Sequence, residues 1–241
     1  CGAIVSLADR IDTIAGCFAI GKQPTGTTDP YGLRRLALGL LHIISARGYI
    51  LSLAELTAKA LELYSGKVTE KTPAAQAAVL DFIRGRYVND LLGRGIPATA
   101  VEAVTSVDFD DVIDCSRRID ALNNVRKEET FTILAGSFKR VRNIIKDHRS
   151  DTLDEALLTE PAEQSLYENF REVAAECEPL LKSRDYRQAM GVILKMKEPV
   201  DNFFDEVMVM ADDEKIRDNR LSLLTAISRL FLKIGDFSKM S

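Results

Sequence analysis

Two histidines and scattered carboxylates are the side chains of this sequence that could bind a metal ion. Asp9 lies on an amphipathic stretch, but a bound metal needs several ligands within about 2–2.6 Å. Neither His42 nor His148 is followed by Asp or stands in an H-E-x-x-H pattern. His42 lies among apolar residues and is expected in the core, whereas His148 is expected at the surface. We predict no metal site and interpret Asp9 as a structural acid, with a metal role as the open alternative.

No other motif predicts a catalytic centre. The loop "GKQPTG" contains a Gly-Lys pair, but it lacks both the P-loop spacing and a preceding strand. No G-x-S-x-G occurs, so no nucleophile elbow is predicted. The cysteines form no C-x-x-C motif, and we expect reduced thiols in a cytoplasmic protein, with Cys17 and Cys177 as small buried apolar residues. The four are Cys1, Cys17, Cys115 and Cys177.

The stretch "FKRVRNIIKDHR" carries the clearest binding signal. Apolar residues spaced by three and four predict one buried helix face: Leu134, Phe138, Val141 and Ile145. Basic residues with the same spacing predict a second face, about 100° away: Lys139, Arg142, Lys146 and Arg149. A cationic stripe on a rigid helix can follow a phosphate backbone, so one interpretation is RNA contact. The other is a solvated face that pairs with the acidic segment following it.

Residues 198–237 predict a helical hairpin with two apolar stripes that face each other. Arg220 falls inside the second stripe, and a buried arginine needs a carboxylate partner. We predict an ion pair between Arg220 and Asp201 or Asp205 that fixes the register of the hairpin, with RNA reading by Arg220 as the alternative. The remaining apolar residues are expected in the core: Phe203, Phe204, Met208 and Met210.

Composition allows one large domain or two small ones. The chain has 241 residues, 46% of them hydrophobic, and a net charge of −4. It has no run of about 18 apolar residues, so no membrane span is predicted. The negative charge argues against a generally basic nucleic-acid-binding protein, so any contact must use a local patch. Because the chain begins with Cys1 and its first methionine is Met190, we interpret it as a fragment of a longer protein.

Helical periodicity runs through nearly the whole chain, and no strand alternation of useful length occurs. Asp29-Pro30 predicts a helix start, and Ser52 predicts another. The expected helices are 4–20, 30–47, 53–65, 73–92, 98–106, 108–124, 126–148, 163–182, 184–210 and 213–235. Pro199 is expected to kink or split the 184–210 helix. A soft boundary separates residues 1–107 from a helical bundle in residues 108–241.

Long stretches of the sequence resemble the beta subunit of bacterial glycyl-tRNA synthetases. "LADRIDTIAGCFAIG", followed by "PTGTTDPYGLRRLALG", is similar to the family pattern ALADK-φ-DTLVGFF-φ-G…PTGS-DPFALRRAALG. "PVDNFFDEVMVMADDEKIRDNRLSLL" is similar to the pattern PVDxFFDxVMVMxxDxxLRxNRLxLL, and "KRVRNII" to KRVxNIL. The match departs at Tyr31-Gly32, where the pattern has Phe-Ala, and this glycine is expected to weaken the helix start slightly.

The resemblance implies an all-α chain: the end of an HD-like domain and a connector in 1–107, then an anticodon-binding bundle in 108–241, similar to that of arginyl-tRNA synthetase. It implies a heterotetramer of two alpha and two beta subunits, in which the alpha subunit uses ATP and Mg²⁺ to activate glycine. This part is then non-catalytic and cofactor-free and binds tRNA(Gly), with no DNA or membrane partner. The expected RNA-binding residues are Lys139, Arg140, Arg142, Lys146 and Arg149.

Two other hypotheses are compatible with the sequence. "LADRIDT" also resembles the last metal-ligand helix of HD-type phosphohydrolases, so the chain could be a remnant of such an enzyme with activity centred on Asp9. Alternatively, residues 1–107 could hold the subunits together without touching RNA.

Overall fold

The computed structural model describes residues 1–64 and 72–240, and it is all-α over these ranges, as predicted. The only β-type pairing in these ranges is an isolated bridge between Thr25 and Thr28. No helix in the described ranges is long and apolar enough to cross a membrane. The chain divides into two compact units, which are described separately: unit 1 is 1–101 with 108–116, and unit 2 is 102–107 with 117–241.

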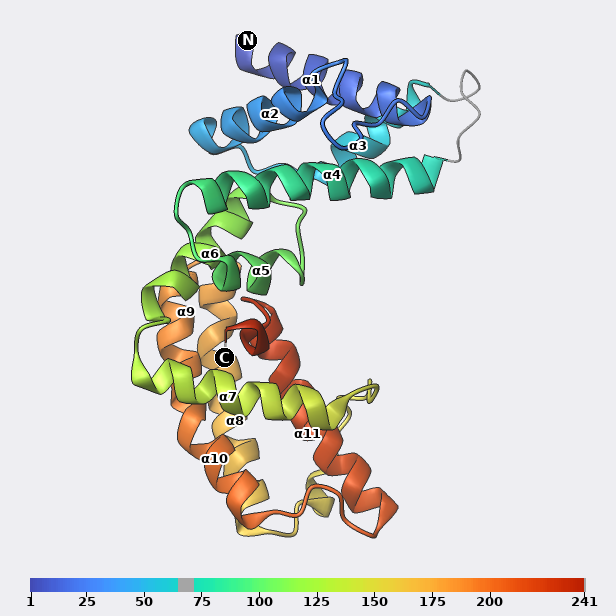
Figure 1. The fold of residues 1–241 in the computed structure, drawn as a ribbon. Helices are drawn as coiled ribbons and strands as arrows, with labels where there is room; N and C mark the ends of the chain where they lie inside the picture. Colours follow the sequence, from blue (N-terminus) through green and yellow to red (C-terminus); the bar gives the residue numbers. More distant parts are fainter. Residues whose placement is uncertain (65–71, 241) are drawn as a thin grey trace. The chain divides into compact units, whose positions relative to one another are not determined.

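The main helices of unit 1 are α1 (Gly2–Ala19), α2 (Leu33–Arg47), α3 (Leu53–Glu62) and α4 (Thr72–Gly93) (Figure 1). Helices α1, α2 and α3 all pack on α4. Fully buried side chains from each helix form the core: Ile14, Leu40, Leu53 and Ile83. The predicted end of the third helix near residue 65 lies outside the described residues.

The start of α2 differs from the prediction. The carboxylate of Asp29 accepts hydrogen bonds from the backbone N–H groups of Leu33 at 2.8 Å and Arg34 at 3.0 Å, so it caps the helix as expected. The helix nevertheless begins at Leu33, because Gly32 has φ +66°. Gly32 therefore does not weaken a helical turn; it occupies a left-handed position that glycine adopts without a Cβ clash.

Unit 2 is a helical bundle (Figure 1). Its main helices are α7 (Glu129–Ile145), α8 (Pro161–Lys182), α9 (Tyr186–Ile193), α10 (Lys197–Glu206) and α11 (Glu214–Leu232), with 3₁₀ turns η1 (Glu155–Leu157), η2 (Leu194–Met196) and η3 (Phe237–Lys239). Phenylalanines from α7, α11 and η3 form the centre of the core, with ring centroids 5.3–5.6 Å apart. They are Phe131, Phe138, Phe231 and Phe237.

Two predicted helices are shorter than expected. The 184–210 helix splits into α9 and α10 around η2, just before Pro199. Pro199 lies in the first turn of α10, where its missing N–H leaves no hydrogen bond unmade. The 126–148 helix begins at Glu129 and ends at Ile145.

Helices α5 (Ala98–Thr105) and α6 (Val112–Val125) each contribute residues to both units. Residues 102–107 belong with unit 2, and residues 108–116 belong with unit 1. The division therefore falls near the predicted boundary at 107/108, but the chain crosses it more than once.

Candidate nucleic-acid interface

Helix α7 buries the face that its apolar spacing predicts. Leu134, Phe138, Val141 and Ile145 are each at most 4% exposed. The neighbouring arc of α7, which includes Thr132, Gly136, Lys139 and Asn143, is exposed. The packing of unit 2 thus fixes which basic side chains reach solvent.

The predicted basic stripe is continuous only to the end of α7. Lys139 and Arg142 lie on the helix, with Lys139 exposed and Arg142 half-buried. Lys146 follows the helix with φ +40°, so Lys146 and Arg149 do not continue the helical face. Arg149 instead bonds to the carbonyl oxygen of Lys146 at 3.2 Å and pairs with Asp147 at 3.6 Å. The predicted single stripe through Arg149 is therefore wrong.

The acidic segment after α7 does not neutralise these cations. Asp151 pairs with Arg229 of α11, and Glu155 lies 3.9 Å from Arg171 of α8. In the described ranges, Lys139, Arg142 and Lys146 form no ion pair. The positive charge on α7 is therefore available to a ligand.

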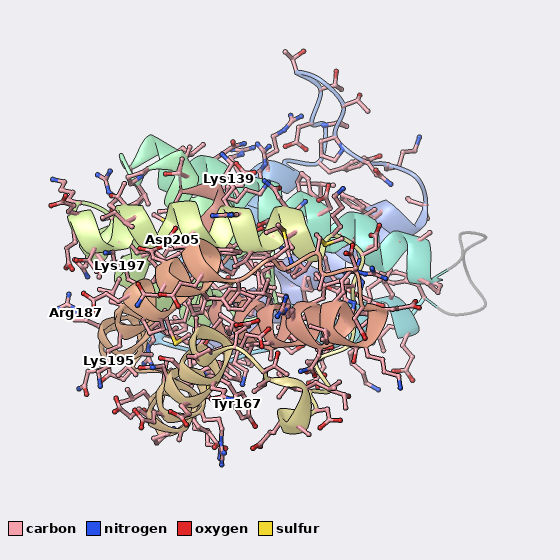
Figure 2. The ribbon with its side chains drawn as sticks, turned by 90° about the horizontal axis from the view of Figure 1, so that it is seen from below. Lys139, Tyr167, Arg187, Lys195, Lys197 and Asp205 are labelled. Atoms are coloured by element: carbon pink, nitrogen blue, oxygen red, sulfur yellow. The ribbon has the colours of Figure 1, made fainter. Side chains whose placement is uncertain are left out.

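Arg140 has a different environment. Its guanidinium carbon lies 4.2 Å from the centroid of the Phe204 ring on α10, a close cation–π contact. Figure 2 shows α7 and α10 with Lys139 labelled on α7 and Lys197 and Asp205 on α10. Arg140 thus lies between the exposed arc of α7 and a hollow that is lined by α7 and α10.

Arg220 is buried, as predicted, but the predicted partners are wrong. Its Nε donates to the carboxylate of Glu163 on α8, and its Nη1 donates to the carbonyl oxygen of Met208 at 2.7 Å. Asp201 instead accepts a hydrogen bond from Ser137 of α7 at 2.6 Å, and Asp205 is exposed. These two aspartates lie on faces of α10 that point to α7 and to solvent, so neither reaches Arg220.

The sequence interpretation of the methionines is also wrong. Met208 is 74% exposed and Met210 is 59% exposed, while Val207 and Val209 are each 7% exposed. Phe203 and Phe204 are buried, as expected. The V-M-V-M alternation in the sequence is the signal that could have identified this outward-facing pair.

The residues considered for catalysis do not assemble into a site. Asp9 is exposed, and the part of the chain that the structure describes contains no group of three His, Cys, Asp or Glu side chains that could hold a metal. His42 is exposed rather than in the core, with its Nε2 3.2 Å from Asp90, and half-buried His148 contacts Ser222 at 3.2 Å. Burial raises the pKa of the Cys177 thiol to about 11, so it remains protonated near neutral pH.

Comparisons with known proteins divide the chain in a similar way. The family described as "Glycyl-tRNA synthetase beta subunit" matches residues 1–106. The family described as "DALR anticodon binding domain" matches residues 135–236, which include the C-terminal part of α7 and all of α8 to α11. The two matches lie largely in different compact units.

Whole-chain relatives are glycine–tRNA ligase beta subunits. The protein from Geobacter sp. (strain M21) is 47% identical over 240 residues, covering 100% of this chain and 35% of the relative. The relative from Geotalea daltonii is 45% identical with the same coverage, and that from Geobacter sulfurreducens is 49% identical over 88% of this chain and 31% of its own length. The chain thus belongs to the family of glycyl-tRNA synthetase beta subunits and spans about a third of the length of the relatives it matches.

Proposed function

We propose that unit 2 binds the anticodon arm of tRNA(Gly), as the anticodon-recognising part of a glycyl-tRNA synthetase beta subunit. The observation that carries this proposal is the unneutralised positive charge of Lys139 and Arg142. Both residues lie on α7 and within the 135–236 region that matches an anticodon-binding domain. In a chain with a net charge of −4, this local patch is the part of α7 that attracts a polyanion.

The patch is suited to the RNA backbone rather than to a particular base. Lysine and arginine side chains that contact phosphates release counterions, which gives affinity and orientation without sequence selectivity. The rigid helix holds Lys139 and Arg142 at a fixed spacing, so they can act together on one strand. Base selection must then come from groups beside the patch.

Charge reversal tests this proposal. In the full synthetase, Lys139→Glu with Arg142→Glu is expected to lower affinity for tRNA(Gly) at least tenfold at low salt. The slope of log affinity against log salt concentration should also flatten by about 1.4–1.8, because two phosphate contacts are lost at about 0.7–0.9 each. Fluorescence titration over a series of salt concentrations measures both quantities.

A matched control uses two cations that already have acidic neighbours. Arg171→Glu with Lys182→Glu on α8 changes the same number of charges, but Lys182 pairs with Glu178 at 2.7 Å and Arg171 lies near Glu155. This control is expected to retain most of the affinity and the wild-type slope. Equal losses in both double variants would assign the effect to net charge and contradict a specific α7 contact.

In this proposal, activation of glycine with ATP and Mg²⁺ takes place in a separate alpha subunit, within an assembly of two alpha and two beta subunits. The names of the relatives support the existence of such a partner, because these proteins are called beta subunits. The present segment then needs no cofactor of its own. Its four cysteines are free thiols, which fits a reducing cytoplasm.

A second role is proposed for unit 1, namely subunit assembly. Helix α1 exposes Ile4 at 65% and Val5 at 67%, next to a hollow of about 350 Å³ whose lining is almost wholly apolar. Large exposed apolar side chains around such a hollow are typical of protein contact surfaces. Ile4→Asp with Val5→Asp should weaken co-purification of the alpha subunit without changing tRNA affinity. Unchanged co-purification would contradict this role.

A further inference from the structure

The connection between α10 and α11 presents two methionines to solvent in a fixed arrangement. Val207 has extended backbone, with φ −114° and ψ 124°. Side chains alternate between the two sides of an extended segment, so the two valines face the core while Met208 and Met210 face outward. Methionine usually fills gaps in cores or forms adaptable binding surfaces, and these two side chains do not fill a core.

Two arginines of α11 hold this segment from its buried side. Arg220 donates to the carbonyl oxygen of Met208 at 2.7 Å, and Arg217 donates to that of Ala211 at 3.2 Å. The side chain of Arg220 is 7% exposed and that of its partner Glu163 is 0% exposed. Because a buried ion pair is expensive to desolvate, it is a poor device for stability alone. Here it also fixes the backbone that carries the methionines.

The methionines border a hollow of about 480 Å³ between α7 and α10. Arg140 and Ile144 line it from α7, and Phe204, Asp205 and Glu206 line it from α10. A volume of this order is within the range of small-ligand pockets, about 300–1,000 Å³. The lining combines a planar cation, soft thioethers and carboxylates.

This combination favours a nucleobase over a phosphate or an apolar peptide. A guanidinium and a thioether both stack on flat aromatic rings. The carboxylates of Asp205 and Glu206 repel phosphate but accept hydrogen bonds from exocyclic amines of bases. A purely apolar side chain would leave these charges without partners. Lys139, next to Arg140 in the chain, can hold the adjoining backbone phosphate.

We infer that this hollow, the Met208–Met210 pocket, receives one unstacked base of the anticodon loop, and that this base carries an exocyclic amine. The inference rests on the proposed function and adds to it the place where a base is read. Arg140, Met208 and Met210 provide the stacking surface, and Asp205 and Glu206 provide the acceptors. Arg217, Arg220 and Glu163 act as positioning residues.

The first test removes the stacking surface in the full synthetase. Met208→Ala with Met210→Ala should weaken binding of the tRNA(Gly) anticodon stem-loop about tenfold or more, since loss of a stacking side chain has effects of that order. The salt slope should stay at its wild-type value, because no phosphate contact is removed. Ile133→Ala is the control and should have little effect, because Ile133 is an apolar residue of α7 that is 40% exposed but does not line this hollow.

The second test identifies the base. Each anticodon-loop nucleotide is replaced in turn by an abasic one. The nucleotide whose base enters the pocket is the one whose replacement gives the wild type and the double methionine variant equal affinity for the stem-loop. At that position, replacing the base by one without the amine (uridine for cytidine, inosine for guanosine) should lower the affinity of the wild-type synthetase for the stem-loop. The same replacement should lower the affinity of the Asp205→Asn, Glu206→Gln double variant much less.

The outcomes separate the inference from the proposed function. If the methionine variant keeps full affinity while Lys139→Glu with Arg142→Glu loses it, the pocket is wrong and the tRNA-binding role stands. If the methionine variant binds tRNA normally but releases the alpha subunit, the surface takes a protein and the inference is overturned. If the wild-type synthetase does not bind the stem-loop at all, both proposals are wrong.

Discussion

Glu163 has no contact with solvent, yet both of its carboxylate oxygens have partners. Oε1 accepts from Nε of Arg220, and Oε2 accepts from the backbone N–H groups of Thr159 at 2.9 Å and Glu160 at 3.0 Å. One side chain therefore caps the N-terminus of α8 and neutralises an arginine of α11. Such a residue is hard to replace, because any change leaves at least one buried group without its partner.

Replacing Glu163 should therefore be strongly destabilising. Glu163→Gln preserves the shape but leaves the Arg220 charge buried and unpaired, and we expect a loss of about 3–5 kcal/mol in the free energy of unfolding. Glu155→Gln is the control, because the Glu155 side chain is 64% exposed and its ion pair with Arg171 is worth less than about 1 kcal/mol. Urea denaturation of both variants measures the difference. Similar losses in the two variants would show that the buried pair carries no special weight.

The partner of Arg220 illustrates what the sequence could and could not predict at this scale. Helical spacing placed Arg220 in an apolar stripe, and the physical need for a carboxylate followed correctly. The sequence offered Asp201 and Asp205 because they are close in the chain and lie on a helix that the apolar stripes predict to face α11. That predicted hairpin is wrong, because α10 packs on α8 and α7 instead. Choosing Glu163 requires knowing that the start of α8 packs beside α11, and no local pattern contains that information.

Two glycines of unit 1 have opposite roles in their helices. Gly48 ends α2 with φ +63°, a conformation that alanine adopts only with strain. Gly85 lies within α4, and a Cβ added there meets no atom within 4 Å. The same substitution should therefore change stability in opposite directions at these two sites.

We expect Gly48→Ala to destabilise the protein by about 1–2 kcal/mol. Gly85→Ala should stabilise it by about 0.5–1 kcal/mol, because alanine loses less backbone freedom in a helix. Thermal unfolding followed by circular dichroism gives the order of the two variants and the wild type. A stabilising effect of Gly48→Ala would mean that the left-handed C-cap of α2 does not form.

At the scale of elements, periodicity predicted the helices and most of their bounds, including the Ser52 cap, which accepts from the N–H of Glu55 at 3.0 Å. The end of α7 could not be predicted in this way. Spacing alone extends the basic face through Lys146 and Arg149, since nothing in "IIKDHR" breaks a helix. The chain leaves the helix because residues after Ile145 interact with α11. His148 forms a hydrogen bond with Ser222, and Asp151 forms an ion pair with Arg229. These are tertiary contacts, which local propensity does not report.

Across the whole molecule, the two units exchange short segments of chain, so neither is a continuous stretch. Residues 102–107 pack within unit 2, where the carbonyl oxygen of Ala103 accepts from the N–H of Asp236 at 2.7 Å. Gly235 lies so close that an added Cβ would be 3.1 Å from the same carbonyl oxygen. The last turn of the chain is thereby held by a segment that precedes the predicted domain boundary.

This exchange predicts how the chain can be cut. A fragment of residues 102–241 retains Ala103 and the buried Val104, whereas one of residues 108–241 loses both and exposes the surface beneath them. Burying a valine side chain is worth about 1.5–3 kcal/mol, and a buried hydrogen bond left unmade costs about 1–3 kcal/mol. The longer fragment should therefore unfold at a clearly higher urea concentration. Equal midpoints would show that 102–107 adds nothing to unit 2 and that the boundary at 107/108, predicted from the sequence, is the physical one.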